Sequence, residues 1–309
     1  MLHLRLITPA EQTDEVVRLI EDTVGTTHLA VIPGAAREPA GDLVMCDVAR
    51  EAGDTLIAGL RRLGLDDTGS IAVENIDLSL SRRADKAEED APGEGADAVL
   101  WEGLTEATHE ESTLSVTYVA FITLATMIAA CGVVLDNAVL IVGAMAVGPE
   151  FGPLAGICTA TVRRRPHLAL RSLTALLVGF AAAMAVTVGF SLFMDAVGLF
   201  HRSALEGRRP NTAFVYAPDA FSFIVALLAG VAGTLSLTSA KSGALVGVAI
   251  SVTTVPAAAN AAVALAYGDM SQTLGSTDQL LLNLLGIILA GTLTLLTQQL
   301  LWNRRQQRL

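Results

Sequence analysis

The pattern of apolar and polar positions changes near residue 113. Before that point, apolar residues recur at short strand and helix periods. After Leu114, uninterrupted apolar runs of roughly 20 residues recur, each long enough to cross a bilayer at about 1.5 Å per residue. The pattern therefore predicts a water-soluble part followed by a helical membrane domain.

The first 81 residues show the alternation of a small α+β domain. Leu2–Ile7 alternates apolar and polar residues, as a half-buried strand does, and Ala10–Val24 has one apolar helical face that Gly25 is placed to end. The remaining predicted elements are strands at Thr27–Ile32, Asp42–Ala49 and Ser70–Leu80 and a helix at Asp54–Leu63, with a break at Pro33-Gly34. The order β-α-β-β-α-β predicts a ferredoxin-like domain over residues 1–81, with two helices on one face of a four-stranded antiparallel sheet.

Two further segments lie before the membrane domain. Residues 82–95 are charged with almost no apolar side chains, which predicts a flexible acidic linker. Residues 96–113 can form an amphipathic helix at the membrane surface, where Trp101 offers an interfacial ring. The alternative is an acidic extension of the first membrane helix.

Six membrane spans are predicted within residues 114–302, followed by a basic tail over 303–309. Their bounds are Leu114–Leu135, Ala138–Thr161, Leu168–Met194, Pro218–Ser239, Gly243–Tyr267 and Gln279–Trp302. With the soluble part inside, eight Lys and Arg residues fall in cytoplasmic segments, and three, Arg202, Arg208 and Arg209, lie in an external loop. The positive-inside rule then predicts that both termini are cytoplasmic. The expected location is the cell (inner) membrane.

The second span contains the least typical stretch of the chain. Pro149 and Pro153 each lack a backbone donor and crowd the preceding turn, so a kink or break is expected there. Non-helical backbone at membrane depth is tolerated where it faces other helices or a water-filled cavity. Because a carboxylate at this depth is costly, Glu150 is the leading functional candidate, flanked by Gly148 and Gly152. The alternative is a structural carboxylate that pairs with an arginine or caps the following half-helix.

An offset of about 104 residues relates the two halves of the membrane domain. It carries the start of the first span near Leu114 onto the fourth near Pro218, and places Pro153 beside Pro256 after a one-residue gap. Three spans per half is an odd number, so tandem halves must insert with opposite orientations, which predicts a 3+3 inverted repeat. Matching interrupted helices indicate a midplane site formed by Glu150 and Asn260, supplemented by the hydroxyl residues Ser251, Thr253 and Thr254.

Other interpretations of these polar and small residues stay open. Serine and threonine in membrane helices often satisfy carbonyls of their own helix or bridge two helices. Gly152, Gly156 and Ala160 form a small-residue face suited to close helix packing, within the chain or between copies.

Charge and composition exclude several classes of function. Residues 1–113 hold 24 acidic and 9 basic residues, and such an acidic part is unsuited to nucleic acid. Three cysteines, Cys46, Cys131 and Cys158, are too few and scattered for a disulfide or zinc framework. The five histidines lack metal-ligand spacing, and no phosphate loop, dinucleotide fingerprint or nucleophile elbow occurs. We therefore expect a protein that is not an enzyme and needs no cofactor.

The first two spans resemble a known membrane family. An Ala-rich first span, then Asp136-Asn137-Ala-Val-Leu-Ile-Val-Gly-Ala-Met145, then the Pro149 and Pro153 break followed by Gly156, resembles the family called domain of unknown function 389. The resemblance covers approximately Leu114 to Gly198, and Glu150-Phe151 stands where many members have apolar residues. It implies an integral membrane protein and no established activity.

Two hypotheses of function follow. The first is a translocator of a small solute or ion that oligomerises with itself and uses its cytosolic domain for regulation or sensing. The second is a non-transporting sensor or scaffold in the lipid bilayer that signals through the ferredoxin-like domain. A translocator predicts that Glu150 and Asn260 face one hydrated cavity, whereas a scaffold allows both to be buried in dry packing.

Overall fold

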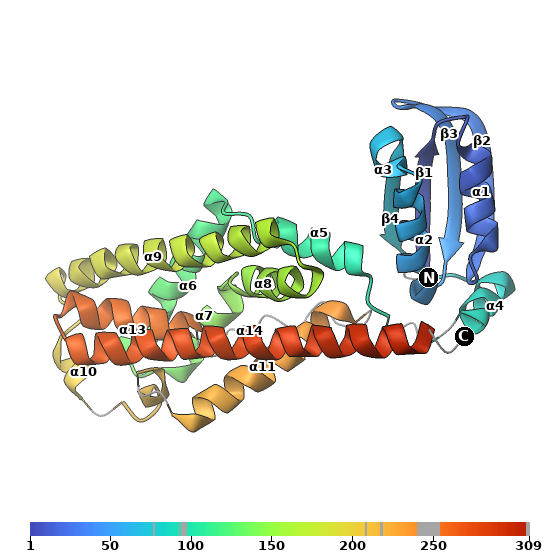
Figure 1. Ribbon diagram of the computed structural model, residues 1–309. Coiled ribbons are helices and arrows are strands. Elements are labelled where there is room, and N and C mark those ends of the chain that lie inside the picture. The colour runs from blue at the N-terminus through green and yellow to red at the C-terminus, as the bar shows by residue number, and fades with distance from the viewer. Residues whose placement is uncertain are drawn as a thin grey trace. The chain divides into compact units, whose positions relative to one another are not determined.

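The computed structural model describes residues 1–76, 78–91, 93, 98–207, 209–216, 219–239 and 254–306. These residues form two compact units (Figure 1). The first unit is formed mainly by residues 1–103 and the second by the described residues between 104 and 300. Each unit is described by itself below.

The first unit contains an antiparallel four-stranded sheet. In chain order its elements are β1 (Leu2–Thr8), α1 (Thr13–Asp22), β2 (Thr26–Arg37), β3 (Ala40–Val48), α2 (Arg50–Arg62), the short α3 (Leu65–Thr68) and β4 (Ser70–Asn75). The strands lie in the order β2-β3-β1-β4, and Leu4 pairs with Cys46 on one side and Val73 on the other. The predicted order of elements and antiparallel sheet are confirmed, and β3 lies between β1 and β2 as a split β-α-β unit requires.

One face of this sheet forms the core because apolar residues alternate along the central strands. Leu2, Leu4 and Leu6 of β1 are each at most 1% exposed. They pack with the apolar faces of α1 and α2, which contribute Val16, Ile20, Leu56 and Leu60. The period of two in the strand and the helical period in α1 and α2 therefore meet in one buried layer.

Strand β2 continues through Pro33-Gly34, where a break was expected. The pairing of β2 with β3 shifts register between Ile32 and Ala36. This irregularity accommodates Pro33 and Gly34 within the strand. Gly34 adopts a positive φ of 63°, and its N–H donates to the Asp42 carboxylate at 2.8 Å. Proline is tolerated here because β2 is an edge strand.

A helix forms within the segment expected to be a linker. Helix α4 spans Arg82–Asp90, and the Ser81 hydroxyl accepts hydrogen bonds from the N–H groups of Arg83 and Ala84 at 3.2 and 3.5 Å. Ala84 and Ala87 are buried. An N-cap and two small buried residues are thus sufficient to order a segment whose composition alone indicates a coil.

The second unit consists of helices. They are α5 (Trp101–Glu111), α6 (Val116–Val134), α7 (Ala138–Val147), α8 (Phe151–Arg163), α9 (Pro166–Ala196), α10 (Ser203–Glu206), the 3-10 turn η1 (Ala213–Val215), α11 (Ala220–Thr238), α13 (Thr254–Ala266) and α14 (Met270–Gln306). Among the described residues, four helices are long and apolar enough to cross a membrane, or five if α7 and α8 count as one bent span. The first half of the predicted fifth span lies outside the described residues.

Helix α14 begins at Met270, nine residues before the predicted start of the sixth span at Gln279. The additional turns contain Gln272 and Ser276, which lower the apolar character that marks a span. Helix α5, expected to lie at the membrane surface, has Leu104, Thr105 and Thr108 buried. Trp101, expected at the lipid interface, belongs to the first unit, where it is 4% exposed and its backbone N–H donates to the Asp54 carboxylate at 3.0 Å.

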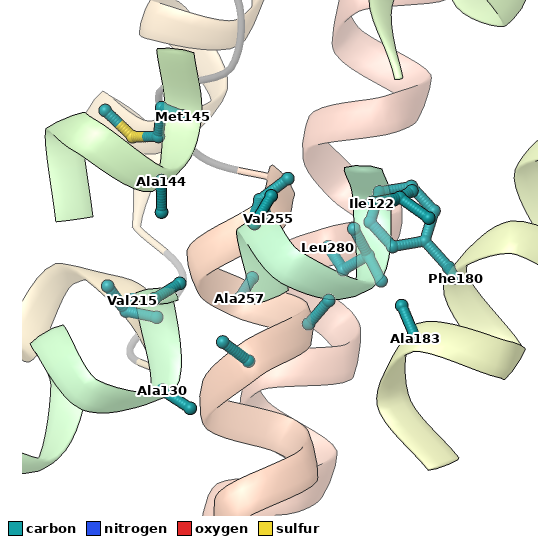
Figure 2. Close-up of a cluster of buried hydrophobic side chains, with 14 of the residues drawn as sticks. Ile122, Ala130, Ala144, Met145, Phe180, Ala183, Val215, Val255, Ala257 and Leu280 are labelled. Atoms are coloured by element: carbon teal, nitrogen blue, oxygen red, sulfur yellow. The ribbon is translucent and has the colours of Figure 1, made fainter. Parts of the chain in front are cut away.

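Helix α13 lies at the centre of the second unit. Every residue from Thr254 to Ala264 is buried. Figure 2 shows Val255 and Ala257 of α13 among side chains of the surrounding helices, including Ile122, Ala144, Phe180 and Leu280. The many alanines of α13 let neighbouring backbones approach closely, which is how helices pack where lipid provides no hydrophobic driving force.

Candidate functional site in the membrane helices

The predicted interruption of the second span is confirmed. Helices α7 and α8 meet at an angle of 54° across Gly148, Pro149 and Glu150. Pro149 lies in the break itself. Pro153 is the third residue of α8, where the missing N–H costs no intrahelical hydrogen bond.

Glu150 faces the start of α13 and is 1% exposed. The Thr254 hydroxyl donates to the Glu150 carboxylate at 2.8 Å. A side chain at Gly148 would collide with that carboxylate and contact Val255, so glycine leaves room for the acid. Glu150 occupies the N-cap position of α8 without a hydrogen bond from its side chain to the helix backbone. The dipole of α8 favours the ionised form of a carboxyl group at this position.

Asn260 lies in a second polar network and is fully buried. Its amide oxygen accepts from Arg209 at 2.8 Å, and its amide nitrogen donates to Ser276 at 2.7 Å. Arg209 also donates to Gln272 at 2.5 Å and lies over the ring of Tyr216, 4.5 Å from its centre. The network therefore joins the segment before η1 to α13 and α14.

Arg209 was predicted to lie in an external loop, and the structure buries all but 4% of it. Burial lowers the pKa of its guanidinium, and the nearby Tyr216 and Asp136 oppose that shift. An arginine keeps its charge under these conditions. The Asp136 carboxylate accepts a hydrogen bond from the hydroxyl of Thr212, three residues after Arg209, at 2.9 Å.

Helix α14 contributes a polar stripe that the sequence analysis did not identify. Ser276, Gln279 and Asn283 are each at most 1% exposed, and Gln272 precedes them by one turn. The spacing of four, three and four residues places all four on one helix face. That spacing was the signal available in the sequence, but the predicted start of the span at Gln279 hid it.

Glu150 and Asn260, predicted to form one midplane site, are both buried and belong to two separate hydrogen-bond networks that each include a residue of α13. Thr254 and Asn260 are six residues apart, which is about 9 Å along α13 and about 120° around its axis. Helices α13 and α14 run antiparallel, and Asn260 of α13 contacts Ser276 of α14. Thr254 lies six residues before Asn260 and Asn283 seven residues after Ser276, so Thr254 and Asn283 lie at about the same level along the two helices. The stripe on α14 thus spans the depth between the two networks.

The remaining predicted site residues are Pro256, Gly152, Ser251 and Thr253. Pro256 is the third residue of α13 and is buried. Gly152 lies against Glu111 of α5, where a side chain would collide, so its role is packing within the chain. Ser251 and Thr253 lie outside the described residues.

A second polar cluster occurs in the first unit. Asp47 on β3 contacts His3 and His28, with carboxylate to Nδ1 distances of 2.7 Å in both cases. The other ring nitrogen of His28 lies 2.9 Å from the Ser81 hydroxyl, and His28 has a positive φ of 52°. Sequence spacing could not reveal this cluster because His3, His28 and Asp47 come from three strands. Within the part of the chain that the structure describes, no group of three or more His, Cys, Asp or Glu residues could hold a metal ion.

The comparisons with known proteins agree with the predicted resemblance. Residues 145–289 match the family model described as Domain of unknown function (DUF389). An uncharacterized protein of Methanocaldococcus jannaschii is 25% identical over 204 residues, which cover 66% of this chain and 61% of that relative. The chain therefore spans about three fifths of the length of the curated relative that it matches. No solved structure gives a significant match.

Proposed function

We propose that the chain, whose residues 145–289 match the DUF389 domain, is a membrane translocator of a small solute or ion. The observation that supports this most directly is the contact between Glu150 and Thr254, which joins the break of α7 and α8 to the start of α13. Polar groups at interrupted helices are where secondary transporters bind their substrates. In this proposal Glu150 binds a proton or cation, and the stripe from Ser276 to Asn283 lines the route.

The inverted repeat belongs to the same proposal, and helix lengths support it. Helices α6 and α11 each have 19 residues and start 104 residues apart, and α9 and α14 also start 104 residues apart. Pro153 of α8 and Pro256 of α13 are 103 residues apart, and each lies ten residues before the last residue of its helix. Glu150 and Thr254 are themselves 104 residues apart. At the offset of 103 that relates the two prolines, this contact joins positions one residue away from equivalence, as is expected near the two-fold axis of an inverted repeat.

Six spans with both termini inside complete the topology that we propose. Two contacts support this arrangement of loops. Asp136 and Thr212, both in segments assigned outside, bond to each other at 2.9 Å, whereas Ser112 and Ser172, near segments assigned inside, bond at 2.8 Å. The proposal includes a cell-membrane location, the absence of a cofactor or enzymatic reaction, and regulation by the sheet domain.

Accessibility of substituted cysteines tests the translocator without knowledge of its substrate. In a chain with Cys46, Cys131 and Cys158 replaced, Ser276→Cys and Thr254→Cys are treated with a membrane-impermeant, hydrophilic thiol reagent in lipid. A translocation route hydrates these positions during its cycle, so we expect both to react. Ala262→Cys, fully buried on α13, and Leu285→Cys, 65% exposed on α14, serve as the dry and lipid-facing controls. If all four remain unreactive, the scaffold is favoured.

Flux measurements address the role of Glu150. Proteoliposomes are assayed with indicator dyes for H⁺, Na⁺, K⁺ and Cl⁻, and Glu150→Gln is compared with the unmodified chain. We expect the variant to fold and to change the flux. Unchanged flux would remove Glu150 from the mechanism.

The alternative is a membrane sensor or scaffold that signals through its sheet domain. The cluster of His3, His28 and Asp47 is the observation that favours it, since two imidazoles on one carboxylate form a polar site on the sheet. Self-association is proposed under either function. A single monodisperse monomer in mild detergent would contradict it.

A further inference from the structure

A pocket of about 450 Å³ lies in the second unit between α5 and the turn that joins α8 to α9. Helix α5 contributes Thr105, Glu106 and His109 to its lining. The turn contributes Arg164, Arg165 and His167. Neither the proposed route nor the sheet cluster uses these residues.

Several contacts hold the two walls of the pocket together. The Ser172 hydroxyl of α9 donates to Ser112 at 2.8 Å, and Arg171 donates to Thr113 at 2.5 Å, both directly after α5. Gly152 of α8 lies so close to Glu111 that a side chain would not fit. The end of α5 is therefore fixed against α8 and α9, and the pocket is part of a packed arrangement.

The lining is predominantly cationic. Two arginines and two histidines, all four exposed, line the pocket together with a single acidic residue, Glu106. Guanidinium groups match the oxygen atoms of phosphate geometrically as well as in charge. Because the basic residues come from two separate elements, the pocket concentrates positive charge at one place.

The start of α9 adds backbone donors to this lining. Pro166 is its first residue, and the N-cap, Arg165, makes no side-chain hydrogen bond to the helix. The N–H groups of the first turn have no intrahelical partner, and such donors are suited to anions. His167 and Leu168 supply them at the pocket wall.

The arginines of the turn occupy positions that carry a cost. Arg164 has a φ of 54°, in the left-handed region that favours glycine or asparagine. Arg165 places a cation at the positive end of the dipole of α9. The positive-inside rule explains basic residues in this segment but not their convergence with His109 around a pocket. A bound anion would offset the electrostatic cost at Arg165.

We infer that this pocket binds a phosphate group, either of a soluble phosphate or of an anionic lipid headgroup. In the topology proposed above, the turn between α8 and α9 lies on the cytoplasmic side, where a soluble phosphate can reach the pocket. A lipid headgroup can also reach it, because Leu170 and Leu173, just beyond the pocket on α9, are 65% and 45% exposed and suited to lipid. The site does not depend on translocation, and its chemistry is the same for either source.

The test measures ligand-dependent thermal stability of the full chain. In neutral detergent, the unfolding temperature is followed against added inorganic phosphate or glycerol 3-phosphate, with sodium chloride at matched ionic strength. In nanodiscs, phosphatidylcholine is compared with phosphatidylcholine containing phosphatidylglycerol. We expect stabilisation in at least one arm. Response to soluble phosphate assigns a free ligand, and response to phosphatidylglycerol alone assigns a lipid headgroup.

Three variants locate the effect. Arg164→Asn removes the guanidinium while suiting the left-handed backbone, and His109→Gln removes an imidazole from the opposite wall. Loss of a charge-assisted hydrogen bond is expected to weaken the apparent affinity about tenfold for Arg164→Asn and less for His109→Gln. Arg163→Gln, which removes the same charge from a residue that does not line the pocket, should leave it unchanged.

Three results would overturn the inference. The first is that neither the detergent arm nor the nanodisc arm shows stabilisation. The second is that Arg163→Gln weakens the apparent affinity as much as the pocket variants do, which would indicate only surface charge. The third is that both pocket variants keep the affinity unchanged. Size-exclusion profiles show whether each variant is folded. Because the two pocket variants lie on different elements, a folding defect in one leaves the other informative.

Discussion

Helices α8 and α13 both end ten residues after a proline, yet their surroundings differ. Helix α8 follows the carboxylate of Glu150, and its Gly156 contacts Ser112 and Ser172 on neighbouring elements. Helix α13 has Asn260 midway along, bound to the buried Arg209. At the offset of 103 residues, Ile157 of α8 corresponds to Asn260 of α13.

This difference teaches that two helices can share the positions that bend and pack them and still differ in the polar groups around them. The shared features are those that bend and pack helices, such as the proline in the first turn and the small residues. The distinct features are polar groups, with a charge beside α8 and an amide network around α13. Function in the membrane domain is therefore expected to depend on the positions where the two halves diverge.

Removal of the arginine beside α13 should give the largest effect. Arg209→Leu leaves the amide oxygens of Asn260 and Gln272 without their charged donor, and we expect a loss of about 2–3 kcal/mol in unfolding free energy. Unfolding in detergent, followed by circular dichroism, measures this. Arg202→Leu, which removes an exposed arginine of the same loop, should destabilise the protein less than Arg209→Leu does. Equal effects of the two variants would show that the network around α13 adds no stability.

Overpacking at α8 should have a somewhat smaller effect. Gly156→Leu would drive a side chain into the hydroxyls of Ser112 and Ser172, and we expect about 2 kcal/mol of destabilisation. Gly143→Leu on α7 is the matched control, because nothing lies within 4 Å of a side-chain atom built there. Similar unfolding temperatures for both variants would contradict the packing of α5 on α8.

The link between the two halves should have the smallest effect on stability. Thr254→Val removes the hydroxyl that donates to Glu150, and we expect a loss of about 1.5 kcal/mol, recovered by Thr254→Ser. Thr161→Val on α8, an exposed hydroxyl that bonds only the carbonyl of Ile157 among the contacts seen, should cost less than about 0.5 kcal/mol. The same unfolding assay applies, and a Thr254→Val variant as stable as Thr161→Val would break the proposed link.

Local patterns in the sequence were sufficient where one physical effect dominated. Apolar runs predicted α6, α9 and α11 closely, and Pro149 predicted the break between α7 and α8. Alternation along β1 and the amphipathic faces of α1 and α2 predicted the antiparallel sheet. In each case the deciding terms, burial of apolar area and loss of a backbone donor, act over a few neighbouring residues.

Pairing between distant polar groups could not be predicted in this way. Arg209 was assigned to an external loop by its charge, but Asn260, Gln272 and Tyr216 provide partners that allow its burial. The start of α14 was misplaced because its polar residues resemble loop residues until a partner helix is present. Helix α4 depended on the capping group of Ser81 and on contacts of two alanines.

By itself, then, the sequence determined the division into a part with a mixed sheet-and-helix pattern and a part with long apolar helices, and it determined the break before α8, since hydropathy and proline act locally. Only the tertiary structure decided that Glu150 meets Thr254, that Asn260 binds Arg209 and Ser276, and that two arginines and two histidines surround one pocket. A hydrogen bond requires two groups at a defined distance, and for residues far apart in the chain that distance is set by helix packing.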